Sequence, residues 1–423
     1  MPKVVATSWP LLLGVMLLMI GNGMQGTLLG IRGTLEGFGT FELSVVMSSY
    51  FVGLLGGSLM VPAMIRRVGH VRVFAALGSV ISAMLVLFPV LPRWEVWVVL
   101  RALMGFSFCG VYISAESWLN SSASNETRGQ VLSAYMIVQL IGTFTAQVLL
   151  NVADPASFTL FVIPSVLVSF AFIPILLADT PAPTFGTIRP LSFPRLWRLS
   201  PLGCMGMLLT GGIFAAMFGM SAVWGSKTGL SVKQITTFVG ALYAGGLVLQ
   251  YPIGWLSDRH DRRKIILALS AFAGVTMLLA GLFSLPFWAL LGVAMVLGGI
   301  ANPLYSLLIA YTNDFLTKED MAAASSGLLF LNGLGAISGP LATGWIMERV
   351  GPNGFFHFIA LNFVALALYA AWRMTRRAAP GVTGQFATVS PTASALAVGA
   401  VMEEADTGEP VLPPEMRGPA APL

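Results

Sequence analysis

Charged side chains are rare inside the long apolar runs of this chain, and Arg101 and Glu116 lie in the same run. Arg101 is a permanent cation that could hold an anionic group, whereas Glu116 is a carboxylate that could take up and release a proton. A charge inside a membrane costs about 2.5–3.5 kcal/mol or more, so each needs a cavity or a partner. Glu116 follows Arg101 by fifteen positions, which is about 22 Å along a helix, so the two side chains cannot pair with each other.

Two interpretations stay open for each charge. Arg101 either faces an internal cavity or snorkels to the outer interface, since it lies only about 9 Å along the helix from Glu95. Glu116 either couples proton movement to another process or anchors the cytoplasmic helix ends by pairing with a basic residue. Its place two residues from the expected end of its helix favours the anchor. The basic partners on offer are Arg66, Arg67, Arg72 and Arg128.

Uncharged polar and tyrosine side chains form a second group of candidates. Inside a membrane such groups either bridge helices or line the path of a solute, and packing remains the alternative for each tyrosine. Together with Arg101, the candidates for a cavity lining are Asn22, Gln25, Tyr50, Tyr112, Gln139, Tyr243, Gln250, Asn302 and Asn332.

Two short segments between apolar runs concentrate the remaining charge. One contains Arg66, Arg67, Gly69 and Arg72, and the other runs from Gly254 to Lys264. Both must stay in the cytoplasm because Lys and Arg resist translocation. In the second segment a carboxylate among guanidinium groups can lock neighbouring helix ends together. We expect the two segments to form a gate on the cytoplasmic side. Its expected residues are Arg66, Arg67, Gly69, Arg72, Glu116, Arg128, Gly254, Asp258, Arg259, Arg262 and Arg263.

The composition is that of an integral membrane protein. Of 423 residues, 56% are hydrophobic and 10% are charged, against about 25% charged in soluble proteins. The net charge of +5 does not predict nucleic-acid binding, because the basic residues are scattered through short loops. Cys109 and Cys204 lie in apolar runs and only three histidines occur, so no disulfide, metal site or cofactor is expected. The first run, Trp9 to Leu29, is too long for a signal peptide.

Apolar runs of about 20 residues predict membrane-spanning helices, and their continuity argues against a strand barrel. We predict an all-α fold with twelve spans in two pseudo-symmetric six-helix bundles. The expected spans are 9–31, 43–65, 73–91, 95–118, 131–152, 158–178, 202–224, 234–256, 265–285, 287–312, 323–347 and 355–373.

The division of the chain follows from a proline-rich, basic segment at 179–200, which predicts a cytoplasmic linker between bundles at 1–178 and 201–377. The tail, 378–423, has no helical hydrophobic pattern and is expected to be disordered. With the N-terminus inside, sixteen basic residues fall on the cytoplasmic side and five outside. We therefore expect both termini in the cytoplasm, and we expect a monomer.

The two halves echo each other when the chain is shifted by 193 residues. Tyr50 then meets Tyr243, and Gly105 meets Gly298. The basic segment at 66–72 falls opposite 258–264 at a shift of 192. Duplicated halves with a solute site between them at mid-membrane are one architecture of secondary transporters.

The segment Gly254 to Arg263 resembles the signature loop G-x-L-x-D-R-x-G-R-R of major facilitator superfamily transporters, with Asp261 at the second glycine. The first half departs further, since Pro62 and Arg66 stand where the glycine and aspartate should be. Arg101-Ala-Leu-Met-Gly105 resembles the fourth-helix motif R-x-x-x-G of the family. Stretches similar to the bacterial YcaD-like subgroup are Asn22-Gly23, Ser49-Tyr50-Phe51, Ala115 to Asn120, Thr127-Arg128-Gly129 and Ser133 to Met136.

This resemblance implies the fold, a transport function and little about the cargo. It implies that Arg101 faces a central cavity and that Asp258 belongs to a cytoplasmic gate. We expect a secondary transporter or facilitator in the bacterial cytoplasmic membrane that moves a small solute by rocker-switch alternating access, with proton coupling left open. The alternative is a transporter-like sensor or assembly partner without flux. The chain shows no motif of ATP coupling and no catalytic constellation, so it is not expected to be an enzyme.

Overall fold

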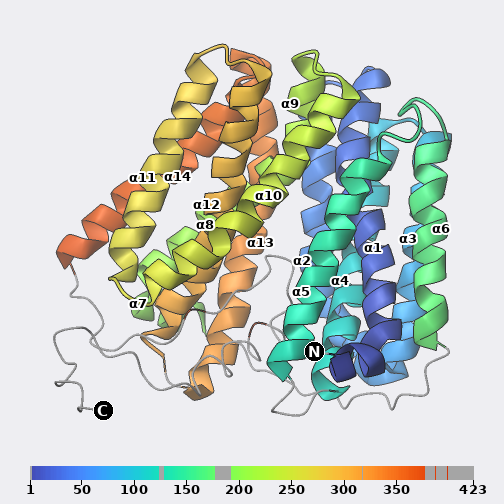
Figure 1. Cartoon of the computed structure of the whole chain (residues 1–423), viewed down its shortest axis with the longest axis horizontal. Helices are drawn as coiled ribbons and strands as arrows, with labels where there is room; N and C mark the ends of the chain where they lie inside the picture. Colours follow the sequence, from blue (N-terminus) through green and yellow to red (C-terminus); the bar gives the residue numbers. More distant parts are fainter. Residues whose placement is uncertain are drawn as a thin grey trace.

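Long apolar sequences become helices in a membrane because only a helix or closed barrel satisfies every backbone hydrogen bond without water. The mean hydropathy of this chain is +0.82. The computed structural model describes residues 2–122, 128–176, 192–316 and 318–376, together with Phe386 and Val398, with some side chains near the gaps left out. Within these ranges the chain is all helical and has no strand (Figure 1).

Fourteen helices occur within the described ranges. They are α1 (Pro2–Leu35), α2 (Thr40–Val68), α3 (His70–Val90), α4 (Trp94–Ser122), α5 (Arg128–Leu149), α6 (Thr159–Leu176), α7 (Phe193–Leu199), α8 (Pro201–Gly219), α9 (Ser221–Lys227), α10 (Val232–Ser257), α11 (Arg262–Leu282), α12 (Phe287–Asn313), α13 (Lys318–Val350) and α14 (Gly354–Arg376).

Nine of these helices, counted in the described part of the chain, are long and apolar enough to cross a membrane. They are α1 from Trp9, α2, α3, α4 to Leu119, α8, α10, α11, α12 and α14. Two shorter apolar helices, Ser133–Leu149 and Thr159–Pro174, lie within α5 and α6. The protein is therefore a multi-pass membrane protein.

The same helix pairings recur along the chain. The helix α2 packs on α4 and α10 on α12, α1 on α5 and α8 on α13, and α3 on α6 and α11 on α14. Glycine permits the close crossing of α2 with α4 and the corresponding crossing of α10 with α12. A Cβ on Gly105 would overlap the carbonyl oxygen of Tyr50, and a Cβ on Gly298 would overlap that of Leu242. Gly105 and Gly298 are the residues matched by the shift of 193.

The helices α1 to α6 lie on one side of the molecule and α8 to α14 on the other (Figure 1). Contacts between the two groups join α2 to α13, α1 to α9 and α5 to α10. The helices α1 and α2 also contact α8, and α1 contacts α10.

Two predicted segments differ in detail from the observed elements. The run at 202–224 is divided at Met220, where α8 ends and α9 begins. The segment 179–200 contains the short helix α7, which starts at a Ser-Phe-Pro sequence suited to a helix N-terminus. The tail 378–423 lies outside the described residues except for Phe386 and Val398.

Candidate functional site

Asn22 is the hub of a polar network between three helices. Its Nδ2 donates to Tyr112 Oη at 2.8 Å, and its Oδ1 accepts from Gln25 Nε2 at 2.9 Å and from Tyr50 Oη at 3.2 Å. Asn22 and Gln25 come from α1, Tyr50 from α2 and Tyr112 from α4. The structure thus brings together four of the residues singled out in the sequence.

Arg101 joins this network from α4 and is only 4% exposed. Its Nη1 donates to Gln25 Oε1, and its Nη2 donates to Met47 Sδ at 3.6 Å. Its guanidinium carbon lies 4.7 Å from the centre of the Tyr50 ring, a cation–π contact. The side chain is therefore held in the interior between α1, α2 and α4, and it does not extend to an interface.

A row of aromatic rings lies in the other half of the chain. Phe218 of α8 stacks on Tyr243 of α10, with ring centres 4.8 Å apart and an interplanar angle of 19°. Phe214 stacks on Phe218 at 6.2 Å and meets Tyr305 of α12 edge-on at 5.9 Å. Of these four, the sequence interpretation selected only Tyr243 as a cavity residue.

The polar network and the aromatic row are neighbours across the interface between the halves. A Cβ on Gly219 would lie 3.3 Å from Met47 Cβ, and one on Gly26 would lie 3.8 Å from the carbonyl oxygen of Phe218. Met47 is the thioether that meets Arg101, and Gly26 follows Gln25 in the chain. A cation with amide and phenol partners therefore stands close to a row of flat rings.

Glu116 lies on α4, fifteen positions after Arg101, and is 1% exposed. Its carboxylate accepts a hydrogen bond from Tyr135 Oη of α5 at 2.9 Å. Arg66, Arg67 and Arg72 are exposed, and no ion pair between described residues joins them to this carboxylate. The side chain of the fourth expected partner, Arg128, lies outside the described residues.

The remaining polar candidates have varied surroundings. Asn332 of α13 donates to the carbonyl oxygen of Met207 in α8 at 3.1 Å and so bridges two helices. Asn302 donates to Gly298 O within α12 at 2.9 Å. Gln139 is buried on α5, and Gln250 is partly exposed two turns beyond Tyr243 on α10. None of these four residues is a hydrogen-bond partner of Asn22, whose partners are Gln25, Tyr50 and Tyr112.

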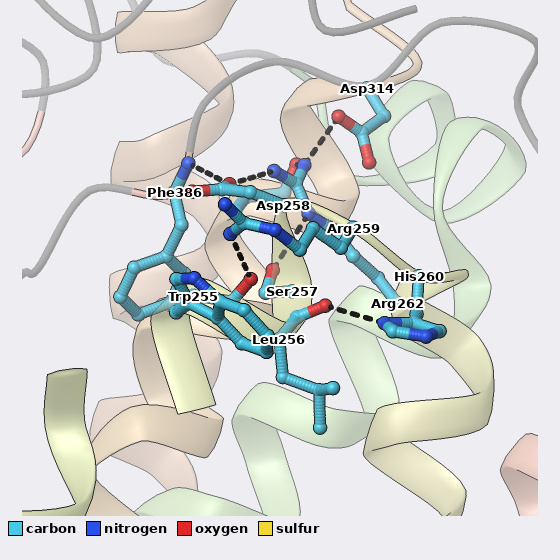
Figure 2. A network of polar contacts seen from close by, with 10 residues as sticks. Trp255, Leu256, Ser257, Asp258, Arg259, His260, Arg262, Asp314 and Phe386 are labelled. Carbon is cyan, nitrogen blue, oxygen red and sulfur yellow. Dashed lines mark hydrogen bonds and ion pairs between the residues drawn. The ribbon is translucent and has the colours of Figure 1, made fainter. Parts of the chain in front are cut away.

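The charged segment after α10 fastens three helix ends together (Figure 2). Arg262 at the start of α11 is 2% exposed, and its Nη1 lies 2.5 Å from Asp314 Oδ1 at the end of α12. The same guanidinium donates to Ser257 Oγ at 3.2 Å and lies 3.8 Å from Asp258. Arg259 instead donates to Trp255 O and stacks over the Trp255 ring. The sequence interpretation missed Asp314, which follows an apolar run and carries no spacing signal.

Asp258 also accepts a hydrogen bond from Phe386, a residue that follows α14 in the chain. The backbone N–H of Phe386 donates to Asp258 Oδ1 at 2.7 Å (Figure 2). The Phe386 ring packs against Gly254, where a Cβ would lie 2.6 Å from the ring. Because Gly254 has no side chain, the Phe386 ring can pack there, a contact that the sequence did not predict.

Asp261 caps α11 and pairs with Arg263. Its Oδ1 accepts from the backbone N–H of Arg263 at 3.0 Å, and its Oδ2 lies 2.7 Å from Arg263 Nη2. Burial alone would raise the pKa of this carboxyl, but the hydrogen bonds and positive charge of Arg263 and the charge of Lys264 lower it below its usual value. In the other charged segment Gly69 connects α2 to α3 with φ of +85°, a conformation that favours glycine.

Away from these residues, a surface hollow of about 350 Å³ is lined by Phe193, Pro194, Trp197 and Arg198 of α7. It contains none of the candidate residues. The candidate site is therefore the group of residues around Arg101, which lies apart from this hollow.

Known proteins resemble the chain in sequence and in fold. The model of the Major Facilitator Superfamily matches residues 202–401. An MFS-type transporter of Yersinia enterocolitica, YE1530, is 28% identical over 355 residues, which cover 83% of this chain and 91% of that protein. The MFS-type transporter YcaD of Escherichia fergusonii is 25% identical over 361 residues, covering 85% of this chain and 94% of YcaD.

Solved structures share the fold at low identity. The nucleoside transporter NupG has a TM-score of 0.69 at 15% identity and covers 88% of this chain and 99% of its own. A bacterial homolog of the human lysosomal transporter Spinster, in an inward-facing and occupied conformation, has a TM-score of 0.67 at 13% identity and covers 86% of this chain and 94% of its own. The resemblance predicted from the sequence is confirmed: the chain is similar to transporters of the major facilitator superfamily, YcaD included, and this similarity indicates a transporter and not an enzyme.

Proposed function

We propose that this protein is a secondary transporter or facilitator that moves a small solute across the bacterial cytoplasmic membrane by alternating access. Counting α8 and α9 as one broken span and leaving out the short α7 gives twelve spans, six before residue 179 and six after residue 200. The repeated helix pairings support two bundles at 1–178 and 201–377 joined by a linker at 179–200. An even number of crossings agrees with both termini in the cytoplasm.

The observation that carries this proposal is the buried network of Asn22, Gln25, Tyr50, Arg101 and Tyr112 beside the aromatic row of the other half. Polar groups inside a membrane are expensive and usually mark a solute path. Here they belong to α1, α2 and α4 of the first group and lie near α8 of the second group, where a rocking motion would expose them to each side in turn.

The solved neighbours support a small solute, since one of them is a nucleoside transporter. The charged segment at 254–264 serves as a gate at the ends of α10, α11 and α12 in this proposal. Protons are a candidate coupling ion, with Glu116 as the candidate carboxylate. Its hydrogen bond from Tyr135 and its burial favour a structural role in which Glu116 holds α4 against α5.

The test is transport by purified protein in liposomes, screened against a panel of metabolites with and without a pH gradient. We expect saturable uptake of at least one solute above protein-free liposomes. No flux for any solute and no shift of the unfolding temperature by any solute would favour a sensor or assembly partner. For Glu116→Gln we expect lower stability and an unchanged pH dependence of uptake. Normal folding with lost pH dependence would assign proton coupling to Glu116.

A further inference from the structure

The surroundings of Arg101 differ from those of the other buried arginines. In the described part of the chain three arginines are buried, Arg101 at 4%, Arg262 at 2% and Arg263 at 8% exposure. Arg262 lies 2.5 Å from Asp314, and Arg263 lies 2.7 Å from Asp261. Arg101 has no carboxylate partner among the described residues, since its contacts are an amide, a thioether and a phenol ring.

One edge of the Arg101 guanidinium is nearly unused. Nη1 is taken by Gln25. Nε has no hydrogen-bond partner among the described residues, and Nη2 meets only Met47 Sδ at 3.6 Å, a weak acceptor. Nε and Nη2 point their N–H groups the same way along that edge, which matches the two oxygens of a carboxylate. A buried cation without a counter-charge is unfavourable, so an anion at this edge would be favoured.

The neighbouring half supplies the other part of a binding surface. Phe218 and Tyr243 are stacked, and Phe214 continues the row. Met47, the residue at the Nη2 edge, lies near Gly219, the neighbour of Phe218, since a Cβ added to Gly219 would be 3.3 Å from Met47 Cβ. Flat rings prefer offset stacking or edge-on contact with other flat rings, so this row suits a planar, largely apolar body.

We propose that the transported solute is a small planar monocarboxylate. Its carboxylate would bind the Nε–Nη2 edge of Arg101 and its flat body would rest against Phe218 and Tyr243. Arg101, the one buried arginine of the described residues without a carboxylate partner, sets the charge of the solute. A second anionic group would lack a partner there, and a neutral solute would leave the guanidinium uncompensated. This inference rests on the proposed transport function and adds the substrate class.

The test measures binding of planar acids and their uncharged amides to the purified protein. The probes are benzoate, cinnamate and indole-3-acetate, each paired with its amide, with acetate and phthalate as a small acid and a dianion. We expect at least one planar acid to bind saturably, by calorimetry and by a raised unfolding temperature, about tenfold or more tightly than its amide. If no acid binds better than its amide, the proposal is wrong. This comparison needs no variant.

Variants then locate the site. Arg101→Gln should lose about tenfold or more of the affinity for the acid, whereas Arg93→Gln, at a side chain that is 73% exposed, should not change it. Phe218→Leu should weaken binding of the planar acid and leave acetate unchanged. Unchanged acid binding in a folded Arg101→Gln protein would overturn the assignment. Uptake of only uncharged solutes would refute the proposed monocarboxylate substrate and leave the transport function intact. Binding of an acid at Arg101 without any flux would refute the transport function and leave the proposed binding site intact.

Discussion

Asp261 shows how one residue changes the character of a charged segment. It stands where the resembling family motif has glycine, and it adds both a helix cap and a carboxylate partner for Arg263. A capping side chain satisfies a backbone N–H that has no partner in the first turn of a helix. The departure from the motif is therefore compensated locally by two contacts that glycine could not make.

Separate substitutions should divide these two contributions. We expect Asp261→Asn to keep the cap and lose the ion pair, and Asp261→Ala to lose both, with Ala costing about 1 kcal/mol more in the free energy of unfolding. Because the folded pKa of Asp261 is lowered, its charge contributes stability that is present above the unfolded pKa and is lost as the pH falls through the folded value. The difference between wild type and Asp261→Asn should be full at pH 7 and should fade below about pH 4. Thermal unfolding in detergent across that range measures it, and a constant difference would contradict the charge contribution.

At the residue scale the sequence predicted the types of side chain at the site but not their connections. Asn22, Gln25, Tyr50, Arg101 and Tyr112 stood out because polar groups are rare in apolar runs. Met47 did not, since it is one of 21 methionines, and nothing in the sequence marks the one that meets a guanidinium. Which polar residues touch depends on helix rotation, and a run that is apolar on nearly every face does not specify that rotation.

Among the elements, the crossing of α2 and α4 depends on glycine. We expect Gly105→Ala to lower the free energy of unfolding by about 1–3 kcal/mol, because the new methyl group overlaps the backbone of Tyr50 and the helices must move apart. Gly56→Ala in α2 is the control, since a Cβ there meets nothing within 4 Å. It should be neutral or stabilising, as alanine favours a helix by about 1 kcal/mol over glycine. Equal effects of the two substitutions in thermal unfolding would show that this crossing is not tightly packed.

Contact between the tail and α10 depends on a second glycine. In Gly254→Ala the methyl group occupies the place of the Phe386 ring, so the hydrogen bond from Phe386 to Asp258 should be lost. Hydrogen exchange followed by mass spectrometry should show faster exchange at the Phe386 amide in this variant than in wild type. Gly292→Ala, where a Cβ meets nothing within 4 Å, should leave that exchange unchanged. Fast exchange already present in wild type would mean that the tail does not dock in solution.

Helix positions were the most predictable property of the elements, because a bilayer requires long apolar runs. The break at Met220 was not predicted, since the residues around it are as apolar as those of an unbroken span. The partner of Arg262 was also missed, because Asp314 comes close only when α11 and α12 are packed together. Contacts between elements distant in sequence leave little trace in the composition of either one.

For the whole molecule, the tight crossings suggest which parts move as units. The pairs α2–α4 and α10–α12 should each stay rigid while the contacts between α5 and α10 and between α2 and α13 change. Spin labels on cysteines at Val52 and Val99, exposed positions of α2 and α4, should give one narrow distance distribution. Labels at Val52 and Val248 of α10 should give a broad or shifting distribution when a transported solute is added. A change within the first pair would contradict motion of rigid pairs.

The separation of the buried cation from the row of rings has a consequence for how such carriers diversify. The guanidinium belongs to α4, and the rings belong to α8, α10 and α12. Substitutions in α8, α10 and α12 can change which shape of solute fits against the rings, while Arg101 of α4 still requires a negatively charged group. Related proteins could thus acquire new cargoes of the same charge through substitutions in the second half of the chain alone.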